Sequence, residues 1–173
     1  MSTNARDSAG NSLAVDEAWS FRTLATVTAF PSAAVIEAGT RRSGRYGSLR
    51  TDDNRYFALN STTSGTRTTS WHGRFAGVSN ALRTLKLTYR GKSSVRCANT
   101  LAIWSWTARR WVSLDSRSVG TGEVQVDRAP PGALADYVSG ASGDGEVRVR
   151  ARCTRSSNFY TGGDLLRVVY ERP

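Results

Sequence analysis

The sequence predicts an all-β protein built as an antiparallel β-sandwich. Several segments alternate hydrophobic and polar residues with period two, which is typical of sheets that bury one face and solvate the other. Glycine and serine interrupt these segments about every eight to twelve residues, and helical patterns are nearly absent. With 173 residues, 39% hydrophobic and 22% charged, the chain is long enough to bury the core of one domain.

The expected elements follow one another closely along the chain. Residues 24–31 form a linker or a first strand that ends at Pro31. Residues 34–39 and 56–62 are expected strands with a Gly/Ser-rich turn between them. Residues 130–138 are expected to hold one helical turn after two prolines. In total, we expect about nine strands after residue 30.

The later strands have the clearest patterns. Residues 82–91 alternate leucine and tyrosine with basic and hydroxyl side chains, and residues 146–153 alternate valine and alanine with arginine. The apolar members of both are expected to face the core. Residues 164–171 are apolar on both faces, so this strand is expected at the centre of a sheet.

The formal charge of +10 comes almost wholly from arginine, because Lys86 and Lys92 are the only lysines. The bias has two interpretations: a GC-rich coding genome, or recognition of anions by bidentate guanidinium groups. In either case the positive field attracts acidic polymers at low ionic strength.

Two cysteines, Cys97 and Cys153, lie in strand-like sequence. With one histidine in the chain, a zinc site is not expected. In an exported protein the two cysteines would form one disulfide between neighbouring strands, contributing roughly 4 kcal/mol. The alternative is two buried free thiols.

The N-terminal segment has the pattern of a domain's end. Residues 7–11 have turn chemistry, and residues 19–23 form a short alternating strand. The segment resembles the last hairpin of bacterial Ig-like modules. The resemblance implies that residues 1–28 are the remnant of such a module plus a linker, that Met1 is an added start, and that the chain is part of a longer exported protein.

The main body, residues 29–173, carries a second resemblance. It contains S-L-x-x-D-D-N-x-Y-F (48–57), T-S-G-T-R-T-T-S-W (63–71) and F-Y-T-G-G-D-L-L (159–166). This order is similar to the galactose-binding-like jelly rolls that accompany secreted bacterial enzymes and surface proteins. The resemblance implies a jelly-roll sandwich acting as a non-catalytic carbohydrate-binding module, which anchors its parent to polysaccharide or cell wall. The alternative is a structural spacer or adhesion module without a small ligand.

Tryptophans are the first candidate ligand residues. Trp104 and Trp106 fall on the face of a hairpin opposite Leu101 and Ile103, which are expected to claim the core. Exposed indoles stack on the C–H faces of sugars. The alternative is a cross-strand pair of Trp106 with Trp111 that stabilises the hairpin.

Loop residues are the second set. In sugar-binding jelly rolls the ligand often sits in loops at one end of the sandwich, which implies site roles for Trp71, Asn158 and Tyr160. Exposure of these aromatic side chains would favour the binding module, whereas their burial would favour the spacer.

Arginines are the third set. Arg148, Arg150 and Arg152 share the outer face of one expected strand. They are suited to binding uronate, sulfate or teichoic-acid phosphate by bidentate hydrogen bonds. The alternative is a solvated face that keeps the sheet from pairing with other sheets.

A carboxylate cluster suggests calcium. Asp52 and Asp53 precede Asn54 on a turn, and oxygen ligands of this kind suit Ca²⁺. Related jelly rolls often hold a structural Ca²⁺ between such a loop and an acidic residue on the last strand, a role that Glu171 would fill. The alternative is an Asx-turn with solvated carboxylates.

Several function classes are not expected. The single histidine, His72, accompanies no nucleophile motif, and the fourteen acidic residues are scattered rather than paired for glycoside hydrolysis. No nucleic-acid module is present. No run approaches the ~18 apolar residues of a membrane span, so membrane insertion is not expected. We expect a secreted or cell-surface monomer that contacts neighbouring domains of its parent.

Overall fold

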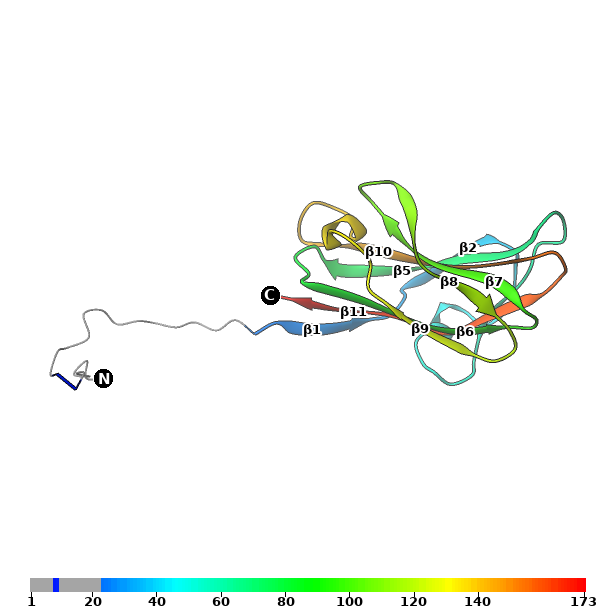
Figure 1. Cartoon of the computed structure of the whole chain (residues 1–173), viewed down its shortest axis with the longest axis horizontal. Helices are drawn as coiled ribbons and strands as arrows, with labels where there is room; N and C mark the ends of the chain where they lie inside the picture. Colours follow the sequence, from blue (N-terminus) through cyan, green and yellow to red (C-terminus); the bar gives the residue numbers. More distant parts are fainter. Residues whose placement is uncertain (1–7, 10–22) are drawn as a thin grey trace.

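The computed structural model describes residues 8–9 and 23–173, and these form two antiparallel sheets packed face to face (Figure 1). The architecture is the expected β-sandwich of jelly-roll type. The expected Ig-like remnant falls almost wholly outside the described residues. No helix in the described part of the chain is long and apolar enough to span a membrane.

One sheet has five strands in the order β2-β5-β10-β7-β8. All of its neighbouring pairs are antiparallel. Its strands are β2 (Ala33–Ala38), β5 (Arg67–Ser79), β10 (Asp144–Arg155), β7 (Cys97–Ser105) and β8 (Arg110–Val119).

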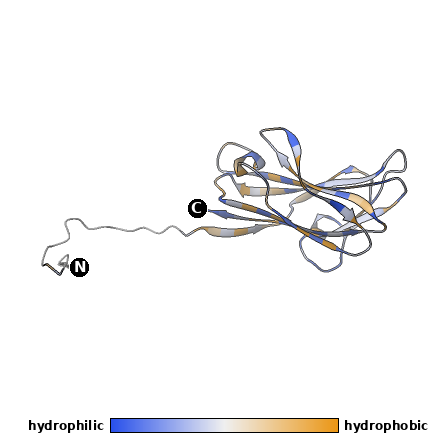
Figure 2. Ribbon diagram, in the orientation of Figure 1, coloured by the Kyte–Doolittle hydropathy of each residue, from blue (hydrophilic) through white to orange (hydrophobic). Residues whose placement is uncertain are grey.

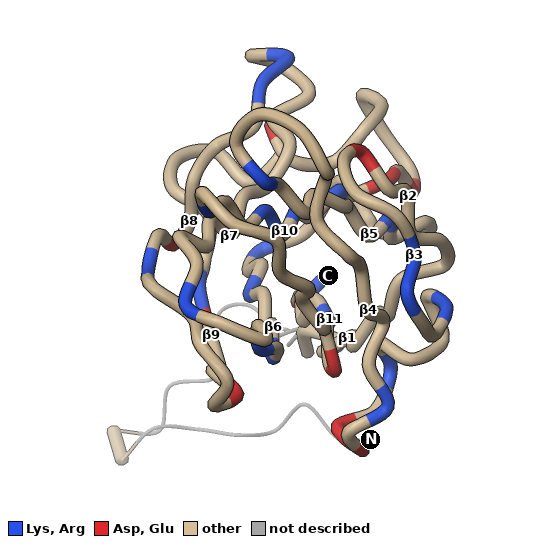
Figure 3. The backbone as a smooth tube through the Cα atoms, turned by 90° about the vertical axis from the view of Figure 1, so that its right-hand side faces the viewer, with Lys and Arg blue, Asp and Glu red and all other residues tan. Residues whose placement is uncertain are grey.

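The other sheet has six strands, with β11 and β6 at its centre. Strand β11 pairs with β6 along one side and with β4 and β1 along the other. Its strands are β3 (Thr40–Ser43), β4 (Phe57–Asn60), β11 (Tyr160–Arg172), β6 (Thr84–Ser93), β9 (Val124–Arg128) and β1 (Ala25–Ala29). Figure 3 looks along the strands and shows the two sheets as two layers.

Two short 3-10 helices complete the described chain. Tyr46–Leu49 (η1) lies between β3 and β4, and Leu134–Tyr137 (η2) lies between β9 and β10. The second is the helical turn expected after the prolines. Ten strands follow residue 30 in the described chain rather than about nine, and β1 begins at Ala25. Residues 25–28, expected in the linker, therefore belong to the sandwich, because they pair with β11.

The core lies between the sheets, where the expected alternation is confirmed. Val147 and Val149 are fully buried on β10, whereas the arginines between and beyond them keep solvent contact. Leu87 and Val168 are fully buried on the inner face of the six-stranded sheet. Along the strands of Figure 2, hydrophobic and hydrophilic residues alternate accordingly. Burial of this apolar face stabilises the fold by about 25 cal/mol per Å².

Two adjacent glycines on β11 let large side chains approach both faces of the central strand. A Cβ on Gly163 would lie 3.0 Å from atoms of Leu49 and Trp71, inside the sandwich. A Cβ on Gly162 would lie 2.9 Å from Cβ of Tyr56, on the outside. Tyr56 and Trp71 therefore pack against opposite sides of this strand where it carries no side chains.

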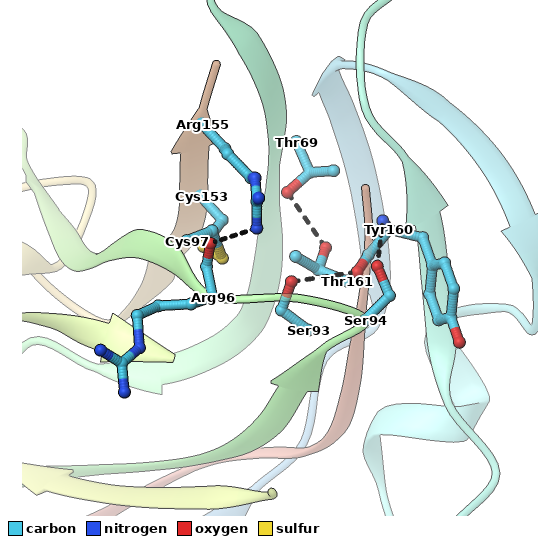
Figure 4. Close-up of a disulfide and its surroundings, with 9 residues drawn as sticks. All are labelled: Thr69, Ser93, Ser94, Arg96, Cys97, Cys153, Arg155, Tyr160 and Thr161. Atoms are coloured by element: carbon cyan, nitrogen blue, oxygen red, sulfur yellow. Dashed lines mark hydrogen bonds between the residues drawn. A yellow bond between two sulfur atoms is a disulfide. The ribbon is translucent and has the colours of Figure 1, made fainter. Parts of the chain in front are cut away.

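Cys97 of β7 and Cys153 of β10 form a disulfide, and no free cysteine is present in the described chain (Figure 4). The expected disulfide between neighbouring strands is thus confirmed. Both residues are buried against Phe159, in a small cluster at one end of the sandwich.

We predict that the paired substitution Cys97→Ala and Cys153→Ala lowers the free energy of unfolding by about 4 kcal/mol. The disulfide joins residues 56 positions apart and so limits the freedom of the unfolded chain. Urea denaturation with and without reductant measures the effect. Reductant should destabilise the native chain and leave the alanine variant unchanged; equal stability of the reduced and oxidised native chain would contradict the prediction.

Candidate functional site

The outer face of the five-stranded sheet carries a cluster of aromatic rings. Strand register places Trp104 of β7 opposite Trp111 of β8, and their ring centroids are 5.3 Å apart in an edge-to-face arrangement. The ring of His72 on β5 lies 5.6 Å from Trp111. We call the surface made by Trp104, Trp111 and His72, together with Arg148 and Arg150, the aromatic face.

Trp111 reaches across its neighbouring strands. Strands β7 and β10 separate β8 from β5, yet the Trp111 and His72 rings are in contact. Ala102 lies between them on β7 with its side chain outward, and it is only 1% exposed. A small residue at this position leaves room for the indole to lie over the sheet, while Trp104 and Trp111 remain partly exposed.

Guanidinium groups lie over the indoles. Arg150 is 4.5 Å from the centroid of the Trp111 ring, and Arg148 is 4.5 Å from that of Trp106. Trp106 lies in the turn after β7 and donates its Nε1 hydrogen to the backbone carbonyl of Glu146 at 2.9 Å. The expected outward placement of Arg148, Arg150 and Arg152 is observed, with two of the three held by cation–π contact.

Two carboxylates neutralise much of this positive charge. Glu37 of β2 accepts hydrogen bonds from Ser70 at 2.7 Å and contacts His72 Nδ1 at 2.8 Å, with Arg150 at 3.9 Å. Glu146 of β10 binds Arg74 and Arg148.

Burial alters the titration of these groups. Burial opposes ionisation of Glu146, but hydrogen bonds from Arg74 and Arg148 outweigh it and hold the pKa of Glu146 below its ordinary value. Burial also lowers the pKa of Arg150, with Glu37 acting in the opposite direction. Glu146 is therefore held in ion pairs with Arg74 and Arg148.

A polar depression of about 500 Å³ adjoins the rings. Glu37, Ser70, Arg150 and Arg152 line one side of it, and residues of the loop before β5 line the other. The face thus offers flat apolar rings next to hydrogen-bond donors and acceptors. Such a combination suits a ligand with apolar faces and polar edges.

Sequence reasoning about the hairpin was partly wrong. The cross-strand partner of Trp111 is Trp104, not Trp106, because β7 ends at Ser105 and Trp106 lies in the turn that follows. Trp111, His72 and Glu37 were not predicted as site residues. Their convergence depends on the order of strands in the sheet, for which the sequence carries no local signal.

Trp71, Asn158 and Tyr160 do not join the aromatic face. Trp71 is 2% exposed and packs edge-on against Phe57 at 5.1 Å inside the core, so its expected place among the ligand-site residues at one end of the sandwich is wrong. Asn158 accepts a hydrogen bond from Arg67 at 2.8 Å and shares a depression of about 480 Å³ with Tyr160 at one end of the sandwich.

A carboxylate cluster lies on the opposite side of the molecule. Oxygen atoms of Asp52, Glu123 and Asp164 are all within 4.8 Å of one another. Of the three residues expected to bind calcium, Asp52 alone is in the cluster. Asp53 instead accepts the Arg55 backbone N–H at 3.1 Å, an Asx-turn. Glu171 lies farther along β11, opposite Thr84, and Asp164 supplies the acidic group on the last strand.

The cluster contains carboxylate oxygens that are available to a cation. Asp164 is 0% exposed, its Oδ1 has no hydrogen-bond partner among the described residues, and its Oδ2 accepts the Asn54 N–H at 3.2 Å. Glu123 Oε1 is likewise buried and without a partner. Arg90 bonds to Asp52 and Glu123 and supplies one positive charge against three carboxylates. Such a set favours a further hard cation.

No family model matches the chain, and no curated protein matches it. The solved structures to which it is similar include three carbohydrate-binding modules. One is a mutant of a family 29 module (9% identity, TM-score 0.49, covering 86% of this chain and 92% of that chain). Another is a family 29 module from Piromyces equi (8%, 0.44, 88% and 93%). The third is TmCBM61 in complex with β-1,4-galactotriose (9%, 0.43, 83% and 86%). Likenesses this distant assign no ligand to the chain.

We predict that Ca²⁺ stabilises the protein by binding the carboxylate cluster of Asp52, Glu123 and Asp164. At a calcium concentration about 100-fold above Kd, the melting temperature should rise by about 5–10 °C. Asp164→Asn should abolish the rise, whereas Asp53→Asn, on the same loop but outside the cluster, should retain it. Thermal unfolding with calcium or chelator measures both. An unchanged melting temperature in the native chain would leave Arg90 as the cation of this cluster.

We also predict that Glu146→Gln lowers the free energy of unfolding at pH 7 by about 1–2 kcal/mol, because two arginines lose a charged partner. The folded pKa of Glu146 is lowered, so its contribution is full above the unfolded value of about 4.3 and is lost as pH falls through the folded value. The difference between variant and native chain should therefore shrink below about pH 4. Asp144→Asn, an exposed neighbour on β10, is the control; a difference independent of pH would count against the ion pair.

Proposed function

We propose that this domain is a non-catalytic carbohydrate-binding module of a larger exported protein and holds that protein on a polysaccharide or cell wall. The ligand chain would lie along the aromatic face. The buried disulfide supports an exported location, since disulfides persist in oxidising compartments.

The observation that carries the proposal is the Trp104–Trp111 pair on the outer face of the sheet. Tryptophans on a sheet surface in contact with solvent cost free energy unless something covers them. Pyranose rings have flat C–H faces that stack on indoles, and their hydroxyl groups require partners at the rim. The indole rings provide a surface for stacking, and the depression lined by Glu37 and Arg152 provides hydrogen-bond partners for the hydroxyl groups.

Charge compensation argues for stacking rather than ionic attraction as the main source of affinity here. Arg148 pairs with Glu146, and Arg150 lies between Glu37 and the Trp111 ring. In the described chain, Arg152 alone of the three has no ion pair. Binding at this face should therefore depend weakly on ionic strength.

The same carboxylates argue against hydrolysis at this face. A glycosidase needs two carboxylates at the bond, one of them an acid with a raised pKa, whereas Glu146 is held by Arg74 and Arg148. The lowered pKa of Glu146 is the opposite of what such an acid needs.

A structural spacer is the second candidate. It is favoured by the contacts that already cover Trp111, which touches Trp104, His72 and Arg150. In that case the rings would stabilise the sheet and bind nothing.

We predict that Trp111→Ala weakens retention on the bound polysaccharide by about tenfold or more, as loss of a central aromatic anchor does. Affinity electrophoresis against neutral and acidic polysaccharides, in low and high salt, measures the effect. Tyr46→Ala is the matched control, because Tyr46 is an exposed aromatic residue on η1, outside this sheet.

Salt-resistant retention of the native chain and of Tyr46→Ala, lost in Trp111→Ala, would support the binding module. Absence of retention on every polysaccharide, with Trp111→Ala less stable than the native chain, would favour the spacer.

A further inference from the structure

A third depression lies on the six-stranded sheet, next to the one that Asn158 lines, and is lined by cations and two tyrosines. Its volume is about 480 Å³, within the range of small-ligand sites. Tyr56 and Tyr160 provide rings, and Arg42, Arg55 and Lys92 provide positive charge. We call it the tyrosine pocket. It belongs to the six-stranded sheet and shares no residue with the aromatic face.

Two of the cations in this pocket have no carboxylate partner among the described residues. Arg42 lies 4.4 Å from the centroid of the Tyr160 ring and donates a hydrogen bond only to the amide oxygen of Asn60, at 3.2 Å. Lys92 lies 4.1 Å from the centroid of the Tyr56 ring. Arg55 contacts Asp53 at 4.0 Å. The arginines of the aromatic face are mostly neutralised, whereas Arg42 and Lys92 are available to bind an anion.

The pocket is preformed by its backbone. The Tyr160 N–H donates to Ser94 Oγ at 3.0 Å, while its carbonyl accepts from the Ser94 N–H at 2.9 Å and from Ser93 Oγ at 3.2 Å. Figure 4 shows the hydroxyl groups of Ser93 and Ser94 hydrogen-bonded to the backbone of Tyr160, whose ring points away from the disulfide. Tyr160 is 39% exposed. Fixing the strand in this way presents an apolar surface at little entropic cost on binding.

Tyr56 is held equally firmly. Its ring packs on Gly162, where a side chain would collide with it, and its hydroxyl donates to Asn54 Oδ1 at 2.7 Å. The Asn54 N–H in turn binds Asp164 of the carboxylate cluster. The wall of the pocket is therefore built on the loop that carries Asp52.

We propose that the tyrosine pocket binds a hexuronate residue of an acidic polysaccharide. Arg42 and Lys92 would bind the carboxylate, and the tyrosine rings would contact the C–H groups of the pyranose. A simple anion leaves the rings unused, and a neutral sugar leaves two cations unpaired, so the combination of both features points to a sugar acid. The cluster of Asp52, Glu123 and Asp164 lies nearby, and Arg90 partly neutralises it.

Calorimetric titration of the full chain with sodium D-glucuronate, D-glucose and sodium sulfate tests this proposal. Glucuronate should bind, weakening as salt is added, and glucose and sulfate should each bind at least about tenfold more weakly. The titrations are run with calcium and with chelator, because the carboxylate cluster adjoins the pocket.

Variants locate the site. Lys92→Met and Arg42→Gln should each reduce glucuronate affinity by about tenfold, the usual effect of losing a charged hydrogen bond. Lys86→Met is the matched control, since Lys86 is the only other lysine and lies on the same strand outside the pocket. Circular dichroism melts confirm that each variant is folded.

Trp111→Ala should leave glucuronate binding unchanged, which separates this proposal from the function proposed for the aromatic face. Loss of binding in Trp111→Ala but not in Lys92→Met would overturn it. Sulfate binding as tightly as glucuronate, glucose binding as tightly, or no binding of glucuronate would each overturn it as well.

Discussion

The backbone hydrogen-bond ladder of β11 is the interaction on which most of the structure depends. This strand pairs with β6 over nearly its whole length and with β4 and β1 on its other side. It carries Tyr160, the two glycines that admit Tyr56 and Trp71, and Asp164. The tyrosine pocket and the carboxylate cluster therefore share one rigid support, because a buried central strand cannot shift without breaking ladders on both sides.

Strand β10 has the same role in the other sheet. Its arginines alternate with buried valines, and it lies between β5 and β7. This position lets Arg150 meet Glu37 on one side and Trp111 on the other. The two candidate surfaces differ as a result: Arg148 and Arg150 of the aromatic face pair with carboxylates, whereas Arg42 and Lys92 of the tyrosine pocket have no carboxylate partner among the described residues.

The sequence predicted what depends on local periodicity. Alternation predicted the sandwich and the outward arginines of β10, and the apolar residues on both faces of 164–171 predicted the central position of β11. The same rule, applied to Thr69, Trp71 and Phe75, would have placed Trp71 in the core, because these residues share a face of β5. The loop-end interpretation of Trp71 overlooked that signal.

Contacts between distant segments could not be predicted in this way. The meeting of His72 with Trp111 needs the order of four strands, and no residue near either one encodes it. Asp164 rather than Glu171 supplies the acidic group because Asp164 contacts the loop that carries Asp52, whereas Glu171 lies farther along β11, opposite Thr84. Asp164 also falls at the shift in register between Gly163 and Leu165. Such an irregularity changes which face a residue occupies, and period-two reasoning does not anticipate it.

The pairing of β1 with β11 has a mechanical consequence. Ala25 lies opposite Arg172 and Ala29 opposite Val168, so the outer ends of both strands meet at the same end of the sandwich (Figure 1). Tension between Leu24 and Pro173 would act at the open end of this five-residue strand. It would break the hydrogen bonds between β1 and β11 one after another from that end, rather than loading all of them at once. Strand β1 would thus peel away at low force while β4 and β6 still held β11 in the sheet.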